Sequence, residues 1–465
     1  MRAILVGAVA FASFIVASRS SQATHRVEEC KAPQEWFKAS GTDPVPVDFA
    51  IADNGDECAF YKWAWQSFLW LTQTDSGEPT QRFILFKTPN DLFDAAGDRK
   101  LQLTASPMGT KDGKRVLSLS VRNSPRTSRD VTAIAIEQAG SQGVLVDQNN
   151  RAVYFGMHVN DRFVSFIRQD LNLKDPEKIK DVDPKKQFPP GCLELKSSWR
   201  VLSDQEKQPD KLRDLGKRYF VTEAVVPTLK EVQEDGQTKI KADPTMPRPE
   251  MVALVGLHVV GTIVNHPEFI WASFEHIDNA PVLPKQDLGN NEPVDNQRDY
   301  TFYRKGKSRG ECNVNPTNPI PNLKLTSAQN QTLVPIVDIF RQFNSGDDLV
   351  SEDDLVKSLN DSVHSQVMSR ENLAIYGNYK LIGAVWFKNP VTDFVEGKDF
   401  RSDDLLVGEK KLSNTTMETF TQPDSSKPNC FRCHNTKSEP ENNKTIPGLR
   451  IKISHIIRNA YLRPQ

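Results

Sequence analysis

The chain has 465 residues, of which 38% are hydrophobic and 26% charged, and its formal net charge is −1. This length favours one large domain or two ordinary ones, and the balanced composition excludes a mainly disordered chain. The near-neutral charge speaks against nucleic-acid binding, because that function needs a basic surface.

Residues 1–23 have the pattern of a secretory signal peptide. Arg2 is followed by an apolar run that ends near Ala17, and Ser21 and Ala23 occupy the −3 and −1 positions of a cleavage site. A membrane anchor is the weaker alternative, because the run is shorter than the roughly 20 residues that a membrane span needs. We therefore expect an exported, periplasmic protein with no membrane span in the mature chain.

The next part of the chain, up to about residue 227, predicts one buried helix followed by a region rich in β-strands. The helix is apolar nearly all round, and the strands alternate or carry β-branched residues. In chain order we expect a helix at 58–73, strands at 82–87 and 116–121, a hairpin at 143–160, a helix at 161–171, and strands at 192–202 and 218–227.

The strand at 192–202 separates charged from apolar side chains. Glu194, Lys196 and Arg200 share one face, and leucine and tryptophan side chains share the other. The charged and proline-bearing stretch at 229–250 that comes later is either a domain boundary or a long surface hairpin.

Two strands flank the sequence NHP within residues 250–281. If Val264 faces Glu268, then His258 and His276 lie side by side on one face, and a one-residue slip instead places His258 opposite Glu275. Either arrangement gives His258 a neighbour that can transfer a proton. The alternative reading is that these histidines are ordinary buried core residues.

The last part of the chain mixes helices and strands. We expect helices at 328–344 and 352–370, a strand at 378–390, and a closing amphipathic helix at 453–462. Together the elements predict an α+β fold with a mainly antiparallel sheet core, packed helices and a C-terminal loop that carries Cys430, Cys433 and His434. The regions expected after the signal peptide are 24–245 and 246–465, which can also form one continuous domain.

The motif Cys430-x-x-Cys433-His434 is the most specific feature of the chain. Random placement of the cysteines and histidines gives this pattern roughly 0.001 times, and it is the pattern of c-type haem attachment. Two thiols add to the haem vinyl groups, and the following imidazole, here His434, ligates the iron from the same side. A zinc site would need two more nearby ligands, and a redox disulfide is the other alternative.

The chain contains six cysteines, and export makes disulfides plausible for those outside the motif. With Cys430 and Cys433 set aside, three pairings remain. We expect Cys30–Cys58 and Cys192–Cys312; isolated buried thiols are the alternative for each pair.

Several segments resemble a group of large secreted bacterial proteins described as cytochrome c family proteins. The resemblance lies in AWQSFLWLT, ELKSSWR, WASFEHIDNAP and TTMETF followed by NCFRCHN. It implies one covalent haem c and a periplasmic location, and says little about the reaction. The residues that fall in these segments include Glu194, Lys196, Arg200, Trp271, Glu275, His276, Met417 and Glu418.

We expect a redox enzyme of peroxidase or oxygenase type, because the chain is far longer than a haem carrier needs. His276 or His258 would move protons, with Glu275 as the orienting group, and Arg200 or Lys196 would pair with a haem propionate or polarise a bound oxygen species. The alternatives are an electron-transfer cytochrome, with His258, His276 or Met417 as second iron ligand, and a small-gas-binding protein. The expected partner is a redox protein or a small-molecule substrate.

Overall fold

The computed structural model describes residues 30–37, 56–74, 80–93, 109–111, 114–119, 134–135, 143–283, 288–314, 322–342, 344–345, 348–349, 354–422, 429–441 and 443–462. The expected signal peptide lies outside these residues. Within them, no helix is long and apolar enough to cross a membrane.

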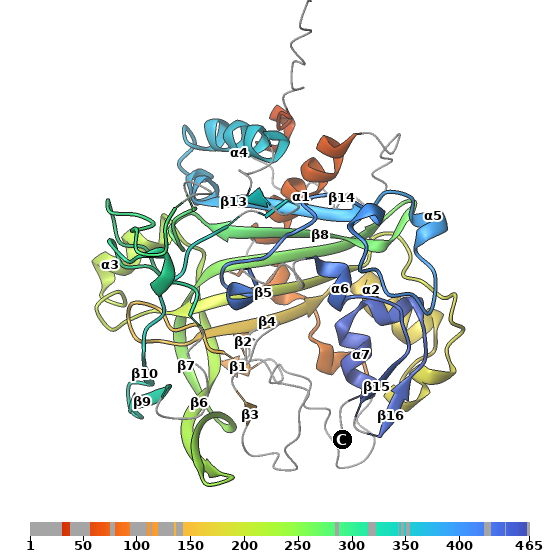
Figure 1. Ribbon diagram of the computed structural model, residues 1–465, viewed down its shortest axis with the longest axis horizontal. Helices are drawn as coiled ribbons and strands as arrows, with labels where there is room; N and C mark the ends of the chain where they lie inside the picture. Colours follow the sequence, from red (N-terminus) through yellow and green to blue (C-terminus); the bar gives the residue numbers. More distant parts are fainter. Residues whose placement is uncertain are drawn as a thin grey trace, which may run out of the picture.

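The fold is α+β, and its centre is a ten-stranded sheet in which only the β2–β6 pair is parallel (Figure 1). The path β1-β2-β6-β7-β8-β13-β14 is extended by β3 and β5, which pair with β7, and by β4, which pairs with β5. The strands are β1 Gly109–Lys111, β2 Lys114–Ser118, β3 Ile134–Ala135, β4 Val153–Val159, β5 Leu193–Val201, β6 Val221–Glu234, β7 Gln237–Ile263, β8 His266–His276, β13 Tyr379–Phe387 and β14 Leu406–Gly408.

Short helices and three two-stranded sheets complete the described fold. The α-helices are α1 Glu57–Thr72, α2 Asp161–Ser165, α3 Pro209–Gly216, α4 Asp354–Val367, α5 Pro390–Asp393, α6 Cys430–Cys433 and α7 His455–Leu462. The small sheets pair β9 Lys324–Ser327 with β10 Thr332–Val334, β11 Asn344–Ser345 with β12 Asp348–Leu349, and β15 Glu439–Glu441 with β16 Lys444–Ile446. A π-helical turn, Phe166–Asp170, continues α2.

The sheet has a buried core on each face. The face that carries Leu195, Leu257 and Phe274 packs against α1 and α4, and we call it the α1 face. The opposite face carries Val260, Trp271 and Val385 and packs against α2, α7 and the chain around the haem motif; we call it the motif face. In Figure 1, α6, α7 and β15–β16 gather beside α2 at one side of the sheet.

The sequence pattern predicted several strands and helices correctly. The expected strands at 192–202, 218–227 and 378–390 are β5, β6 and β13, and the expected helices at 58–73, 352–370 and 453–462 are α1, α4 and α7. The hairpin at 143–160 is confirmed by the Val146–Ala152 bridge that leads into β4, and the strand at 116–121 is confirmed in part by β2. The helix at 161–171 is α2 with its π-helical turn, and it begins after an Asn160 cap.

Two expected elements are wrong. Residues 82–85 form a 3₁₀-helix, Arg82–Leu85, because Phe83 and Ile84 are both buried and the local bond from Phe86 N–H to Phe83 O replaces a strand ladder. The expected helix at 328–344 is absent because Thr332–Val334 pairs with β9 and Pro335 follows, which has no amide hydrogen for a helix.

The stretch at 229–250 is a long antiparallel hairpin formed by β6 and β7 (Figure 1). Strand β7 runs through residue 245 without interruption, so the chain on both sides of that position contributes strands to one sheet.

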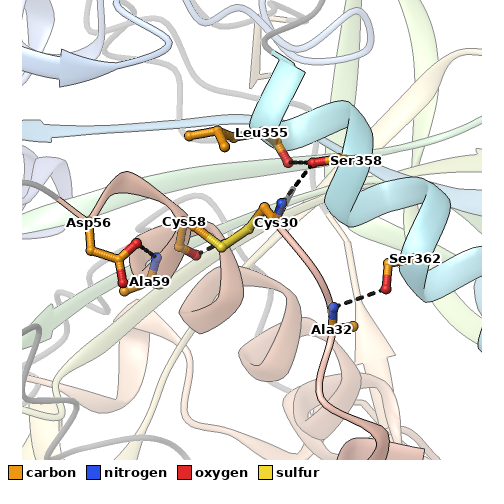
Figure 2. Close-up of a disulfide and its surroundings, with 8 residues drawn as sticks. All are labelled: Cys30, Ala32, Asp56, Cys58, Ala59, Leu355, Ser358 and Ser362. Atoms are coloured by element: carbon orange, nitrogen blue, oxygen red, sulfur yellow. Dashed lines mark hydrogen bonds between the residues drawn. A yellow bond between two sulfur atoms is a disulfide. The ribbon is translucent and has the colours of Figure 1, made fainter. Parts of the chain in front are cut away.

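One of the two expected disulfides is present. Cys30 and Cys58 are bonded, with Cα atoms 5.6 Å apart, and join the segment before α1 to the first turn of that helix (Figure 2). The expected Cys192–Cys312 bond is wrong, because both thiols are free and buried in separate apolar clusters.

Candidate functional site

The haem motif forms a single helical turn, α6, on the motif face. The Asn429 side chain caps it and accepts a hydrogen bond from Arg432 N–H at 3.0 Å. The turn half-buries Cys430 and exposes Cys433. A backbone bond from His434 N–H to Cys430 O, 2.8 Å long, closes the turn. Both thiols and the imidazole therefore come from one compact unit.

The ring of His434 is held by a backbone carbonyl and by aromatic contacts. Its Nδ1 lies 2.9 Å from Ile453 O, and since a carbonyl can only accept, Nδ1–H is the donor. In the neutral ring the lone pair is then on Nε2. The ring lies 4.0 Å from the Trp271 ring and stacks on His455 at 3.6 Å, centroid to centroid.

These features fit the ligand chemistry of a c-type haem. Metal-ligating histidines usually donate their second ring N–H to a carbonyl or carboxylate, which fixes the tautomer. Phe431 is fully buried against Phe387, with centroids 4.5 Å apart, and anchors the motif turn to the sheet. The buried indole N–H of Trp271 has no hydrogen-bond partner among the described residues, so it is available to an acceptor such as a carboxylate.

A charged cluster lies on the same face of the sheet. Lys196 on β5 pairs across the strands with His258 on β7. Glu418 approaches both of them: His258 Nε2 lies 3.1 Å from Glu418 Oε2, and Lys196 Nζ lies 3.7 Å from Glu418 Oε1. The structure thus brings together two of the site residues expected from the sequence with a carboxylate that was not expected in this role.

The electrostatics of the cluster keep Glu418 ionised and link it to the motif. Burial acts to raise the pKa of the Glu418 carboxyl, but the charges of His258 and Lys196 outweigh it and hold the pKa at about 2. Burial, followed by the charges of Glu418 and Cys433, raises the pKa of the Cys430 thiol above its usual range. The cluster and the motif therefore act on one another electrostatically.

Glu275 lies on the motif face but does not orient His258. Its Oε1 accepts a hydrogen bond from Thr415 N–H and lies 3.5 Å from Arg341 Nη1 in a buried ion pair. It anchors the segment before the motif to β8.

His276 and His258 lie on opposite faces, so the expected register is wrong. His258 pairs with Ser273, which is three residues from His276. A two-residue turn joins Ile263 to His266, with Asn265 at φ 65°, and a bulge between Gly261 and Ile263 then shifts the pairing. Neither effect is visible in the hydrophobic pattern.

The surroundings of His276 are those of a structural histidine. Its Nε2–H donates to Arg218 O at 3.1 Å, and its Nδ1 accepts from Asp278 N–H at 3.1 Å. The ring stacks on Tyr219 with centroids 3.6 Å apart. Burial lowers the pKa of this imidazole to about 3.

Arg200 is also far from the motif. It bonds Glu206 Oε1 at 2.8 Å and lies over the Tyr219 ring, within the surroundings of His276. At about 3.3 Å per residue, the four positions from Lys196 place it roughly 13 Å along β5 from the cluster. Met417 is fully buried and belongs to the apolar cluster that contains α1 residues, not to the one that contains Phe431 of the motif.

Sequence reasoning missed four contacts of the site. Ile453 O and His455 belong to the segment expected as the closing amphipathic helix, and Glu418 was noted only within a resembling segment. Trp271 was noted in the same way. The signal available for Glu418 was its place next to Met417 just upstream of the motif, but nothing in the chain order predicts its pairing with β7.

No known protein family, curated protein or solved structure matches this chain. Among the residues that the structure describes, no group of three or more His, Cys, Asp or Glu side chains is placed to hold a metal ion. Function is therefore inferred from the motif and the residues around it.

Proposed function

We propose that the protein is an exported c-type mono-haem oxidoreductase. Cys430 and Cys433 would hold the haem through thioether bonds, and His434 would ligate the iron. Bound haem supplies one-electron redox chemistry and a site for small molecules at iron. The protein supplies the axial ligand, its orientation and the polar groups beside it.

The observation that carries this proposal is the hydrogen bond from His434 Nδ1–H to Ile453 O. It fixes the tautomer in which Nε2 can bind a metal, and it comes from a segment 19 residues further along the chain. A redox disulfide between Cys430 and Cys433 would not need this second contact. Together with the spacing of the motif, the bond favours haem over the alternatives.

The charged cluster favours an enzyme over an electron carrier. A carrier needs a second iron ligand, and two of the three candidates are unsuited to that role. His276 uses both ring nitrogens on the opposite face, and Met417 is fully buried in a different apolar cluster from the motif residue Phe431. Lys196, His258 and Glu418 instead place acid–base groups beside the motif.

The Cys30–Cys58 disulfide supports export. Disulfides persist in oxidising compartments such as the bacterial periplasm. The proposed haem attachment at Cys430 and Cys433 would take place in the same compartment.

The test is a pyridine haemochrome assay and a haem stain of denatured protein purified from the periplasm. We expect one covalent haem in the wild type and none in the variant that combines Cys430→Ala with Cys433→Ala. Cys312→Ala is the matched control, because Cys312 is also a free cysteine but lies in a separate cluster, and it should keep the haem. Equal staining of the double variant would overturn the proposal.

A further inference from the structure

The cluster of Lys196, His258 and Glu418 is reached by solvent in an otherwise buried part of the sheet. The side chains of these residues are 16%, 19% and 24% exposed. Their neighbours on the same face, Ser198 and Ser273, are fully buried. Solvent therefore reaches charged side chains on two central strands, which indicates that a small molecule can reach His258 there.

The hydrogen bonds fix the tautomer of His258. Its Nε2 lies within 3.3 Å of both carboxylate oxygens of Glu418, so Nε2–H donates and Nδ1 carries the lone pair. Asn414 N–H donates to Glu418 Oε2 at 3.0 Å and holds the carboxylate in place. Within the described part of the chain, His258 makes no other hydrogen bond.

The cluster lies next to the haem motif. Ser273, the cross-strand partner of His258, is two residues from Trp271 on the same face of β8, or about 7 Å away. Trp271 contacts the His434 ring. The Glu418 charge also acts on the Cys430 thiol.

We propose that His258, positioned by Glu418, is the proton acceptor for a small protic molecule bound at the haem site. The proton passes from H–X to Nδ1 of His258, and the electron pair of the H–X bond stays on X. The products are the anion X⁻ and an imidazolium that the Glu418 carboxylate stabilises; the same imidazolium returns the proton later. This inference rests on the proposed function.

Two charged groups lie against His258. They are the Glu418 carboxylate, which bonds to its ring, and Lys196, its cross-strand neighbour on β5. Glu275 and Arg341 on the same face compensate one another as a buried ion pair. Glu418 is thus the single carboxylate, among the described residues, that bonds to the His258 ring.

The test is the rate of cyanide binding to the ferric haem protein. The shift in haem absorption measures this rate in a stopped-flow instrument, at pH values between 5 and 8. Cyanide arrives as HCN and must lose its proton, so the rate reports the base. We expect His258→Asn to lower the second-order rate constant at least tenfold. Glu418→Gln should also lower the rate constant, because it removes the carboxylate that positions the His258 ring, and Glu418→Asp should restore part of the rate.

His364→Gln is the control. His364 is a half-buried histidine on α4, away from the motif face, and its Nε2 lies 2.7 Å from Tyr379 O. It should leave the rate unchanged. Covalent haem and an unaltered ferric spectrum establish that each variant is folded. A decrease of less than tenfold for His258→Asn, or a spectrum showing that His258 itself ligates the iron, would overturn the inference. Absence of covalent haem in the wild type would overturn the proposed function and this inference with it.

Discussion

At the scale of single residues, Glu194 is a carboxyl group placed where its charge is costly. It is buried on the motif face, and its Oε2 accepts a hydrogen bond from Ser454 Oγ at 2.6 Å. Burial raises the pKa of this carboxyl to about 7, and the Ser454 bond opposes the rise. The folded protein therefore holds a proton here more tightly than the unfolded chain does.

The sign of the pH dependence follows from this shift. Stability from the protonated carboxyl is fully present below the unfolded pKa and is lost as pH rises through about 7. The loss is about 3 kcal/mol, at roughly 1.4 kcal/mol for each pKa unit. We expect Glu194→Gln to gain stability relative to wild type between pH 5 and pH 8, as measured by urea unfolding at both values.

Other titrating groups, including His276, are common to both proteins and cancel in this comparison. Ser454→Ala is the matched variant, because it removes the hydrogen bond and keeps the carboxyl; the wild-type direction of the pH dependence should remain. Parallel pH curves for Glu194→Gln and wild type would contradict the assignment.

The motif and the residues around it show how much of a site can be predicted from a sequence. Spacing alone predicts Cys430, Cys433 and His434 as the proposed attachment site, since the residues that such attachment needs are close together in the chain. The two neighbours expected for His258, His276 or Glu275, are both wrong, and Glu418 lies beside its ring instead. A contact between residues 160 positions apart depends on how a loop folds onto a sheet, which periodicity does not encode.

At the scale of elements, β5 and β7 position the cluster. Alternation predicted the faces of β5, because Leu193, Leu195 and Trp199 pack into the α1 face as expected. It did not predict the β7–β8 register, because a two-residue turn pairs Ile263 with His266. The resulting register places His258 opposite Ser273, one position from the expected pairing, and a shift of one residue changes the face. The helices α1 and α4 were predicted because each has buried apolar side chains spread along its whole length.

The segment before the motif approaches the sheet closely at Gly256 on β7. A Cβ at this position would lie 2.6 Å from both Ser198 Oγ and Thr416 Oγ1, which are hydrogen-bonded to each other in a buried site. We expect Gly256→Ala to lower the free energy of unfolding by about 1–3 kcal/mol through overpacking. It should also reduce haem incorporation, because Glu418 and the motif follow Thr416 in the chain.

Urea unfolding and the haem content of purified protein measure these two effects. Gly216→Ala is the control, because a Cβ at Gly216, the last residue of α3, has no atom within 4 Å. Its stability should stay within about 0.5 kcal/mol of wild type. Equal stability of the two variants would mean that the approach at Gly256 is not tight.

At the scale of the whole molecule, the two faces of the sheet have different roles. The motif face carries the proposed haem site, and the α1 face carries the core formed by α1 and α4. The disulfide belongs to the α1 face. There, Cys30 N–H donates to Ser358 Oγ at 3.1 Å, and Ala32 N–H donates to Ser362 Oγ at 3.0 Å, so the N-terminal segment lies along α4 (Figure 2).

The disulfide should therefore stabilise the fold without supporting the haem. It closes a loop with a sequence separation of 28, for which loop-closure entropy gives about 3.6 kcal/mol. We expect the variant Cys30→Ser with Cys58→Ser to unfold at lower urea concentration than wild type and to retain the proposed covalent haem. Dithiothreitol should destabilise the wild type to the same extent, since it reduces disulfides but not thioethers. It should have no effect on the variant, because the other cysteines described are not bonded to one another. If the variant lost its haem as well, the two faces of the sheet would be coupled, and the separation of stability from function argued from the two cores would be wrong.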